Sequence, residues 1–346
     1  MRKIIALVFV FAFVLSGCGG NEIEGRNFVS VMGIDDAEGE NYNVTLGFIT
    51  PDGEDMYTAQ AKSIETPTAA VTDKLISSGK RQMYFGHLKA IVVGKDALYR
   101  PEPLNEILSM SSSDSDISMD TIILASERKA SDIVSSVSGS GDGLYVWDFY
   151  KNNKNRLYSS QKLTLAEAVK QNDTQNGIVI PMIDADDENI DIQGGIICTG
   201  GLYSGKLDTG EMQGFIYLCE DGKGKTEVIS VNSKNIPFEI KRNVNEIKFF
   251  ENGGKLSADI DISVKAHSLN EYDFDIDSEN DIAGLLEGQI ERKAESAADK
   301  LQSFNCDALG LGYSLMREDS GLYDKYSQAD MFKNMDLNIN VSVFLE

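Results

Sequence analysis

Apolar and polar residues follow different patterns in the two halves of the chain. The first half opens with two strand-like segments, FVSVMGID (residues 28–35) and YNVTLGFIT (residues 42–50), and the second has apolar residues at every second position. We expect them to pair as a hairpin, because the turn-like AEGEN separates them. Thr66 then caps a predicted helix that has Pro67 at its first position and ends at Gly79.

Strands and helices continue to alternate through the first half, which predicts an α/β region. The expected elements are a strand at 88–94, a helix at 101–110, a strand at 122–124, a helix at 130–137, a helix at 164–169 capped by Thr164, and a strand at 178–183. The acidic run DADDENID (residues 184–191) follows them. We expect this run to be a charged connector, and it gives the best domain boundary, near residues 184–193.

The second half is dominated by short strand-like segments with glycine-rich turns. Successive strands are predicted at 194–203, 214–220, 225–231, 236–242 and 246–251. The clearest is LSADIDISVKA (residues 256–266), where every second residue is apolar. Ser278 and Asp281 then start a long helix with one apolar stripe, and residues 337–345 form a last alternating strand.

These patterns predict a mixed α+β protein of more than one domain. An N-terminal α/β region, residues 28–190, would carry a candidate internal break near residues 138–143. A strand-rich C-terminal domain, residues 194–346, would contain an antiparallel-type sheet with one long amphipathic helix across one face.

The first residues have the pattern of a bacterial lipoprotein signal. Twelve apolar residues run from Ile4 to Leu15 behind Arg2 and Lys3, which is too short a run to span a bilayer. The run ends in Leu-Ser-Gly-Cys, which resembles the lipobox of bacterial lipoproteins, where the cysteine receives a diacylglycerol and the peptide is cut before it. We therefore expect residues 1–17 to be a signal peptide, Cys18 to be the lipid attachment site, and residues 18–27 to be a tether.

Charge narrows the classes of partner. The net charge is −23, and cleavage of the signal would remove Arg2 and Lys3, which leaves −25. The acidic residues are spread along the chain, and such a body is repelled by nucleic acid and by anionic headgroups. We therefore expect no nucleic-acid partner. The lipid anchor would hold an acidic body on the extracytoplasmic face of the membrane.

Cysteine and histidine give little chemistry. Cys198, Cys219 and Cys306 remain after Cys18, and an odd number argues against a full disulfide framework. Cys198 and Cys219 could pair, although buried thiols are the preferred interpretation. The two histidines, His87 and His267, have no nucleophile motif beside them, so we interpret them as structural.

Two acidic runs fail the pattern of a calcium loop. A loop starting at Asp184 would place Asn189 where glycine is required and Gly195 where glutamate is required, and a loop starting at Asp273 fails in the same way. The glycine-rich residues 139–143 lack the lysine and hydroxyl of a phosphate loop. The sequence therefore predicts a protein that is not an enzyme, with no catalytic residue, cofactor or metal site.

Four segments, in order, resemble the Ger(x)C family, the lipoprotein C subunits of spore germinant receptors. They are the lipobox with EIEGRNFVSVMGID, the strand MYFGHLKAIVVG, the segment IQGGIICTGGLYSGKLDTGEMQGFIYL, and the long helix followed by CDALGLGYSLMR. The resemblance covers nearly the whole chain. Gly19-Gly20 stands where the family often has Trp-Asp, and EDSGLYDKYSQADMF stands where it often has Pro and Trp. These departures leave the subfamily and the partner paralogue open.

The resemblance implies a function in spore germination. It implies a subunit without catalytic residues that works with a polytopic A subunit and a membrane B subunit in the inner membrane of the dormant spore. His87, Gly86 and residues 310–312 would be fold determinants or interface, and the fold role is preferred. The alternative from another class is an extracytoplasmic solute-binding lipoprotein of a transporter, which would have two α/β lobes around a cleft.

Overall fold

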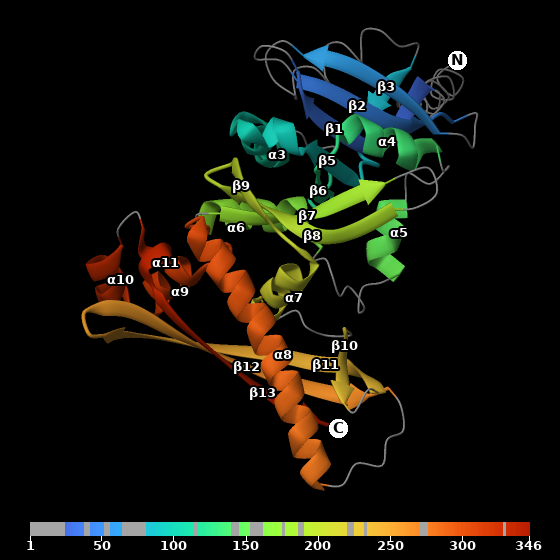
Figure 1. The fold of residues 1–346 in the computed structure, drawn as a ribbon. Helices are drawn as coiled ribbons and strands as arrows, with labels where there is room; N and C mark the ends of the chain where they lie inside the picture. The colour runs from blue at the N-terminus through green and yellow to red at the C-terminus, as the bar shows by residue number, and fades with distance from the viewer. Residues whose placement is uncertain are drawn as a thin grey trace, which may run out of the picture.

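The protein is built on two β-sheets that carry helices (Figure 1). The structure is a computed structural model that describes residues 25–37, 42–51, 56–63, 81–113, 117–139, 145–152, 162–174, 177–185, 190–219, 225–231, 234–269, 276–327 and 330–346. Its mixed α+β architecture confirms the predicted fold class.

The first sheet has nine strands in the order β3-β2-β1-β5-β6-β7-β8-β9, with β4 paired to β1. Strands β1, β4, β5 and β6 run parallel, whereas β2, β3, β8 and β9 join by antiparallel pairing. The strands are β1 (Arg26–Asp36), β2 (Tyr42–Ile49), β3 (Met56–Ser63), β4 (Gln82–Tyr84), β5 (Ala90–Gly94), β6 (Ile122–Ser126), β7 (Gly177–Ala185), β8 (Ile190–Thr199) and β9 (Leu202–Leu207).

Helices cover both faces of this sheet, which gives the N-terminal body two cores. One core contains α3 (Glu102–Ser113) and α6 (Leu165–Thr174), and the other contains α4 (Ala130–Gly139) and α5 (Tyr145–Asn152). The short helix η2 (Lys95–Tyr99) follows β5. Because both faces are covered, the central strands β5 and β6 are buried at every position.

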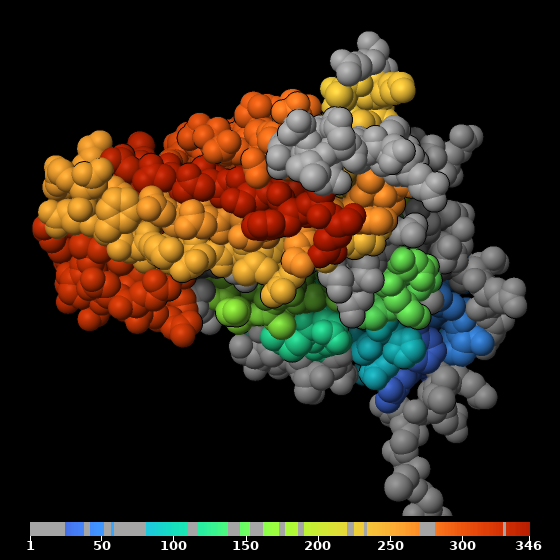
Figure 2. All heavy atoms as spheres, turned by 90° about the horizontal axis from the view of Figure 1, so that it is seen from below, coloured from blue at the N-terminus to red at the C-terminus, as the bar shows by residue number. Residues whose placement is uncertain are grey.

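The second sheet has the order β10-β11-β12-β13 and lies under two helices. Its strands are β10 (Thr226–Val231), β11 (Lys234–Asn252), β12 (Lys255–Ser268) and β13 (Asp336–Leu345). The helices α7 (Thr209–Leu218) and α8 (Ile276–Ser303) pack on one face, and α9 (Leu311–Glu318), α10 (Ser320–Tyr326) and α11 (Met331–Asn334) follow α8. The outer face of β12 and β13 is seen from below in Figure 2. On these strands, Asn338 donates to Asp259 and Asn340 donates to Asp261.

Most of the predicted elements are confirmed. β1 and β2 form the expected hairpin, and Thr164 caps α6 by accepting the Glu167 N–H at 3.2 Å. The alternating residues of β12 and the apolar stripe of α8 face each other and are buried, as expected from their periodicity. β13 pairs parallel to β12, so the sheet is mixed at that edge, because α8 returns the chain to the same end of the sheet.

Three predictions in the second half are wrong. The single strand expected at 194–203 is the end of β8 and the start of β9, which are joined by a turn at Gly200 and Gly201. Residues 214–220 were expected to form a strand, but they belong largely to α7, in which every residue from Met212 to Leu218 is buried. A helix buried on all sides has no amphipathic period, so its apolar run looks like a buried strand. The strands expected at 236–242 and 246–251 are one strand, β11, which continues through an irregularity between Ile240 and Arg242.

The two ends of the acidic run 184–191 belong to paired strands. β7 reaches Ala185, β8 starts at Ile190, and Asp184 pairs with Asp191. The first sheet therefore continues across the boundary expected from the sequence. The helix predicted between Thr66 and Gly79 lies outside the described residues, and α8 begins at Ile276, two residues before the predicted start at Ser278.

Two close contacts join strands β7 and β9 to the segment that follows α8. The ring of Phe304, just after α8, lies against Gly205 of β9, where a Cβ would come within 2.5 Å of Phe304 Cε2. Cys306 Sγ similarly lies against Gly177 of β7, where a Cβ would come within 2.2 Å. The end of α8 is therefore seated directly on the β7–β9 strands.

Candidate functional site

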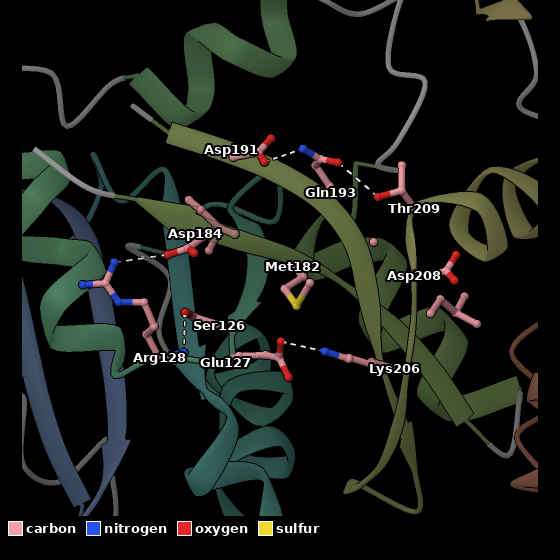
Figure 3. A pocket seen from close by; sticks show the side chains of 13 residues that line it. Ser126, Glu127, Arg128, Met182, Asp184, Asp191, Gln193, Lys206, Asp208 and Thr209 are labelled. Carbon is pink, nitrogen blue, oxygen red and sulfur yellow. Dashed lines mark hydrogen bonds and ion pairs between the residues drawn. The ribbon is translucent and has the colours of Figure 1, made fainter. Parts of the chain in front are cut away.

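An open pocket of about 350 Å³ lies at the carboxyl end of β6, where β7, β8, β9 and the start of α7 meet it (Figure 3). Ligand sites in sheets that include parallel strands are typically found at this end of the strands. The pocket is lined by Ser126, Glu127, Arg128, Met182, Ile183, Asp184, Asp191, Gln193, Gly194, Lys206, Leu207, Asp208 and Thr209.

The curl of the β7–β9 strands brings these residues together. Gly194 has φ of +69°, and a Cβ there would come within 2.6 Å of the Leu207 carbonyl oxygen. Lys206 of β9 reaches Glu127, which follows β6, with Nζ 2.8 Å from Oε2. This contact joins strands that are not neighbours in the sheet. The hydrogen bond to Glu127 raises the pKa of Lys206, which therefore stays charged.

The other polar groups of the pocket hold one another. Arg128 donates to Asp184 at 3.3 Å and to the Ala185 carbonyl at 2.7 Å. Gln193 donates to Asp191 and accepts from Thr209 at 3.0 Å. These pairs are exposed to solvent, so each contributes little to stability.

Asp208 fixes the start of α7 at the pocket edge. Its carboxylate accepts the Glu211 N–H at 2.8 Å, and the Glu211 side chain accepts the Asp208 N–H at 2.8 Å. This reciprocal arrangement is a capping box. The pocket is thus attached to the helix that packs on the second sheet.

The chemistry of the pocket suits noncovalent contact. Its lining residues include neither histidine nor cysteine, and the Ser126 hydroxyl accepts the Arg128 N–H at 3.1 Å. A nucleophile needs a base within hydrogen-bond reach, and the Thr209 hydroxyl instead donates to the Gln193 amide oxygen. The pocket combines cations, carboxylates and an amide, which suit a polar ligand or a polar protein surface.

A second, acid-rich pocket of about 440 Å³ adjoins it at the carboxyl ends of β1, β5 and β6. Asp35 of β1 is buried there and accepts the Ala130 N–H at 2.6 Å and the Ser131 N–H at 2.8 Å. Asp35 therefore caps α4. Among the described residues, no group of three or more His, Cys, Asp or Glu could hold a metal ion.

The residues that the sequence analysis discussed as candidates lie apart from the first pocket, the one beside Lys206 and Glu127, except Asp184. Cys18 is outside the described residues. His87 is exposed in the turn before β5, with its ring 5.1 Å from Phe28, and His267 on β12 lies 2.8 Å from the Glu346 carbonyl oxygen. Glu127, Arg128 and Lys206 were not singled out, because only the long-range strand pairing reveals their proximity.

The cysteines differ from the pairing that the sequence left open. Cys198, Cys219 and Cys306 form no disulfide within the described residues, and the neighbour of Cys198 is Cys306, whose thiol lies 3.6 Å from the Cys198 carbonyl oxygen. Burial raises the pKa of both thiols, that of Cys306 to about 12. Both are therefore unreactive protonated thiols in the core.

The segment CDALGLGYSLMR is explained by a cap. Asp307 is buried and accepts the Leu311 N–H at 2.9 Å and the Gly312 N–H at 2.8 Å, at the start of α9. Gly310 has φ of 72°, and a Cβ at Gly312 would come within 3.2 Å of Asp307 Oδ2. The glycines therefore serve the fold, as preferred from the sequence. Gly86 does too, because a Cβ there would come within 2.4 Å of the Tyr84 hydroxyl.

Comparison with known proteins identifies the family. Residues 19–185 match the family described as "Spore germination protein N-terminal domain", and residues 193–346 match "Spore germination B3/ GerAC like, C-terminal". The chain belongs to the Ger(x)C family of spore germination proteins. Ger(x)C proteins are the C subunits of germinant receptors, which places this chain in spore germination, as the resemblance implied.

Two relatives illustrate the membership. This Ger(x)C protein is 20% identical to "Spore germination protein A3" of Bacillus subtilis (strain 168) over 289 residues, which cover 80% of this chain and 77% of that protein. Its fold is similar to that in "Crystal Structure of the GerBC protein", with a TM-score of 0.61, 18% identity, and coverage of 91% of this chain and 96% of that chain.

Within the described part of this Ger(x)C protein, no helix is both long enough and apolar enough to cross a membrane.

Proposed function

We propose that this Ger(x)C protein is the lipid-anchored, non-catalytic C subunit of a nutrient germinant receptor. It would be tethered through Cys18 to the extracytoplasmic face of the spore inner membrane. There it would assemble with a polytopic A subunit and a membrane B subunit. This assembly would be required for germination.

The observation that carries the proposal is the position of the lipobox relative to the family match. The match to the N-terminal spore germination domain begins at residue 19, directly after the Leu15–Cys18 lipobox. Two or three acyl chains on one residue give stable membrane attachment. Tethering raises the concentration of the body near membrane partners, so that weak contacts are enough for assembly.

The proposed non-catalytic role agrees with the pocket chemistry. The polar lining residues hold one another, and the thiols of Cys198 and Cys306 are buried away from it. The body would therefore act through the surfaces that it presents to partner subunits.

Co-purification from spore inner membranes tests the proposal. The native chain and a Cys18→Ala variant would be isolated in mild detergent, and their partners identified by mass spectrometry. We expect the native chain to recover an A subunit and a B subunit, and the variant to recover much less of both. A Lys333→Gln variant, changed at an exposed position far from Cys18 in sequence, serves as the matched control and should behave as native.

Recovery of an ABC-type permease instead would favour the solute-binding alternative. Equal recovery of the A and B subunits with Cys18→Ala would show that tethering is irrelevant to assembly. Germination assays on the same strains then separate assembly from function, because an assembled but inactive receptor retains its partners.

A further inference from the structure

The amino-terminal end of the first sheet carries a group of cations and aromatic rings. Arg26 at the start of β1 pairs with Gln82 of β4, so β1 and β4 begin at the same level. The guanidinium carbon of Arg26 lies 4.9 Å from the centre of the Tyr84 ring. Phe28 meets the Tyr84 ring edge-on and His87 lies tilted beside it, with ring centres 6.0 and 5.9 Å from that of Tyr84.

A second part of this group surrounds Trp147 of α5. The ammonium groups of Lys89 and Lys162 each lie 5.1 Å from the centre of its ring. Lys89 directly precedes β5, and its N–H donates to the Ser30 carbonyl of β1 at 2.8 Å. Lys162 precedes Leu163, whose carbonyl accepts the Ile123 N–H of β6 at 2.8 Å. Both lysines are thus at the amino ends of parallel strands.

The two parts lie on the same face of the sheet. Val29 and Met83 belong to the core on the α3 and α6 side, so the alternating neighbours Phe28 and Tyr84 point to the α4 and α5 side. We call the residues Arg26, Tyr84, Lys89, Trp147 and Lys162 the amino-end patch. Each of these side chains is partly exposed.

The charge of the amino-end patch contrasts with the rest of the body. It contains three cations in a chain whose net charge is −23. The opposite ends of the same strands carry the acid-rich pocket with Asp35, Asp36, Asp96 and Asp132. The N-terminal body is therefore polarised along its strands.

The proposed lipid site at Cys18 lies close in sequence to the amino-end patch, which would bring the patch to the membrane. Only seven residues separate Cys18 from Arg26. An extended chain of that length reaches at most about 28 Å. An acylated Cys18 would therefore hold the start of β1 close to the headgroups.

Lysine, arginine, tryptophan and tyrosine side chains together are typical of the membrane interface. Resting on the proposed lipid anchoring, we propose that the amino-end patch is the surface by which this protein contacts anionic phospholipid headgroups. The carboxyl-end pockets would then face away from the membrane. Asp120 and Asp148 are acids of the same region, and Asp52, Glu54 and Asp55, between β2 and β3, lie outside the described residues. The negative charges of these acids oppose the attraction of the patch to anionic headgroups, so the experiment must measure net binding to vesicles.

Trp147 is the only tryptophan of the protein, so its fluorescence reports on the patch alone. The acylated chain would be reconstituted on vesicles of phosphatidylcholine with phosphatidylglycerol that contain a headgroup-labelled quencher lipid. We expect the protein to float with the vesicles and the Trp147 emission to be quenched. Flotation without quenching would overturn the patch and leave the anchor intact.

Charge variants of the unacylated mature chain with Cys18→Ala test the patch without the anchor. Arg26→Gln with Lys89→Gln should weaken binding to anionic vesicles by about 5-fold to 25-fold, at about fivefold for each cation. The matched control, Lys248→Gln with Lys333→Gln on the second sheet and α11, makes the same charge change and should alter binding less than about twofold. Equal effects of the two pairs would overturn the patch.

The acylated and unacylated experiments distinguish a failure of the patch proposal from a failure of the proposed lipid anchoring. Failure of the acylated chain to float would contradict the anchor, and the unacylated arm would still decide the patch. Pure phosphatidylcholine vesicles should bind the unacylated chain much more weakly than anionic vesicles, because the attraction depends on headgroup charge. Equal binding to both lipids would contradict the proposed recognition of anionic headgroups.

Discussion

Asp35 and Gly94 occupy adjoining positions at the ends of the neighbouring strands β1 and β5, and the Asp35 carboxylate leaves no room for a side chain at position 94. A Cβ on Gly94 would come within 2.4 Å of Asp35 Oδ1, the same oxygen that accepts the Ala130 N–H at the start of α4. Gly33, two residues before Asp35, is also in close contact with α4, since a Cβ there would come within 2.9 Å of Val134 Cγ2. Gly33 and Asp35 belong to the Gly-Ile-Asp segment that resembles the family. This segment therefore positions the start of helix α4.

The first prediction is that Asp35→Ala and Gly94→Ala are coupled. Asp35→Ala removes a helix cap and should cost about 1–2 kcal/mol. Gly94→Ala forces a side chain against the carboxylate and should cost about 1–3 kcal/mol. The double variant should cost clearly less than the sum, because removal of Asp35 removes the clash.

Urea denaturation of the four proteins measures this coupling. Gly94→Ala combined with Asp208→Ala, the cap of α7, is the control, and distant changes of this kind should add within about 0.5 kcal/mol. Additive costs for Asp35 and Gly94 would show that the close contact does not set the stability of α4.

The second prediction contrasts two glycines of α7. A Cβ on Gly214 would come within 1.9 Å of the Lys293 carbonyl oxygen of α8, whereas a Cβ on Gly210 would have its nearest neighbour, Asp208 Oδ1, at 3.4 Å. Gly214→Ala must separate the two helices and should cost at least about 2 kcal/mol. Gly210→Ala should be neutral or stabilising by up to about 1 kcal/mol. Thermal and urea unfolding of both variants check the contrast, and similar costs would contradict it.

The same helix shows where sequence patterns stop being informative. The strand β12 could be predicted because one face is buried and the other is solvated, which imposes alternation. In α7 burial is continuous, and residues 214–220 give no period. In β11 the inward-facing Asn243 and Asn245 interrupt the apolar pattern, because both donate to the Tyr217 carbonyl at 2.8 Å, at the end of α7. The two asparagines that contact α7 therefore interrupt the apolar pattern of β11, so that one strand looks like two in the sequence.

The candidate pocket could not be predicted for a related reason. Glu127 and Lys206 are 79 positions apart in the sequence and belong to strands that are not adjacent in the sheet. Neither lies in a motif that specifies chemistry. Their proximity depends on strand order and on the curl at Gly194, and local periodicity contains neither. The lipobox and the family segments, in contrast, are local patterns, so they were accessible from the sequence.

The third prediction concerns Glu227 of β10 and Lys293 of α8. Glu227 is fully buried and accepts from Lys293 at 2.7 Å, from Gln289 at 2.6 Å and from the Tyr217 hydroxyl at 3.1 Å. Lys293→Met would leave the carboxylate in the core without this cation and should cost about 3–5 kcal/mol. Glu227→Gln with Lys293→Met removes both charges and should recover most of that loss.

Denaturation midpoints of the single and double variants measure this effect. The control is Lys241→Met, which removes the cation of an exposed pair with Glu239 and should cost less than about 1 kcal/mol. A double variant as unstable as Lys293→Met alone would show that the loss comes from packing of the lysine stem and not from the buried charge.

The last prediction uses the pH dependence of Asp307. Burial raises the pKa of this carboxyl from 3.8 to about 6, although the N–H groups of Gly312, Leu311 and Gly310 lower it. Between these two values the folded protein holds a proton that the unfolded chain has released. The contribution of Asp307 to stability is therefore complete below the lower value and is lost as pH rises through about 6.

The size of the effect follows from the shift. A change of this extent corresponds to on the order of 3 kcal/mol between pH values below and above the window. Asn cannot titrate, so Asp307→Asn should be more destabilising relative to native at pH 4 than at pH 7. Urea denaturation of both proteins at the two pH values measures the difference. A larger cost at pH 7 would mean that the two N–H donors of α9 outweigh burial and hold the carboxylate ionised.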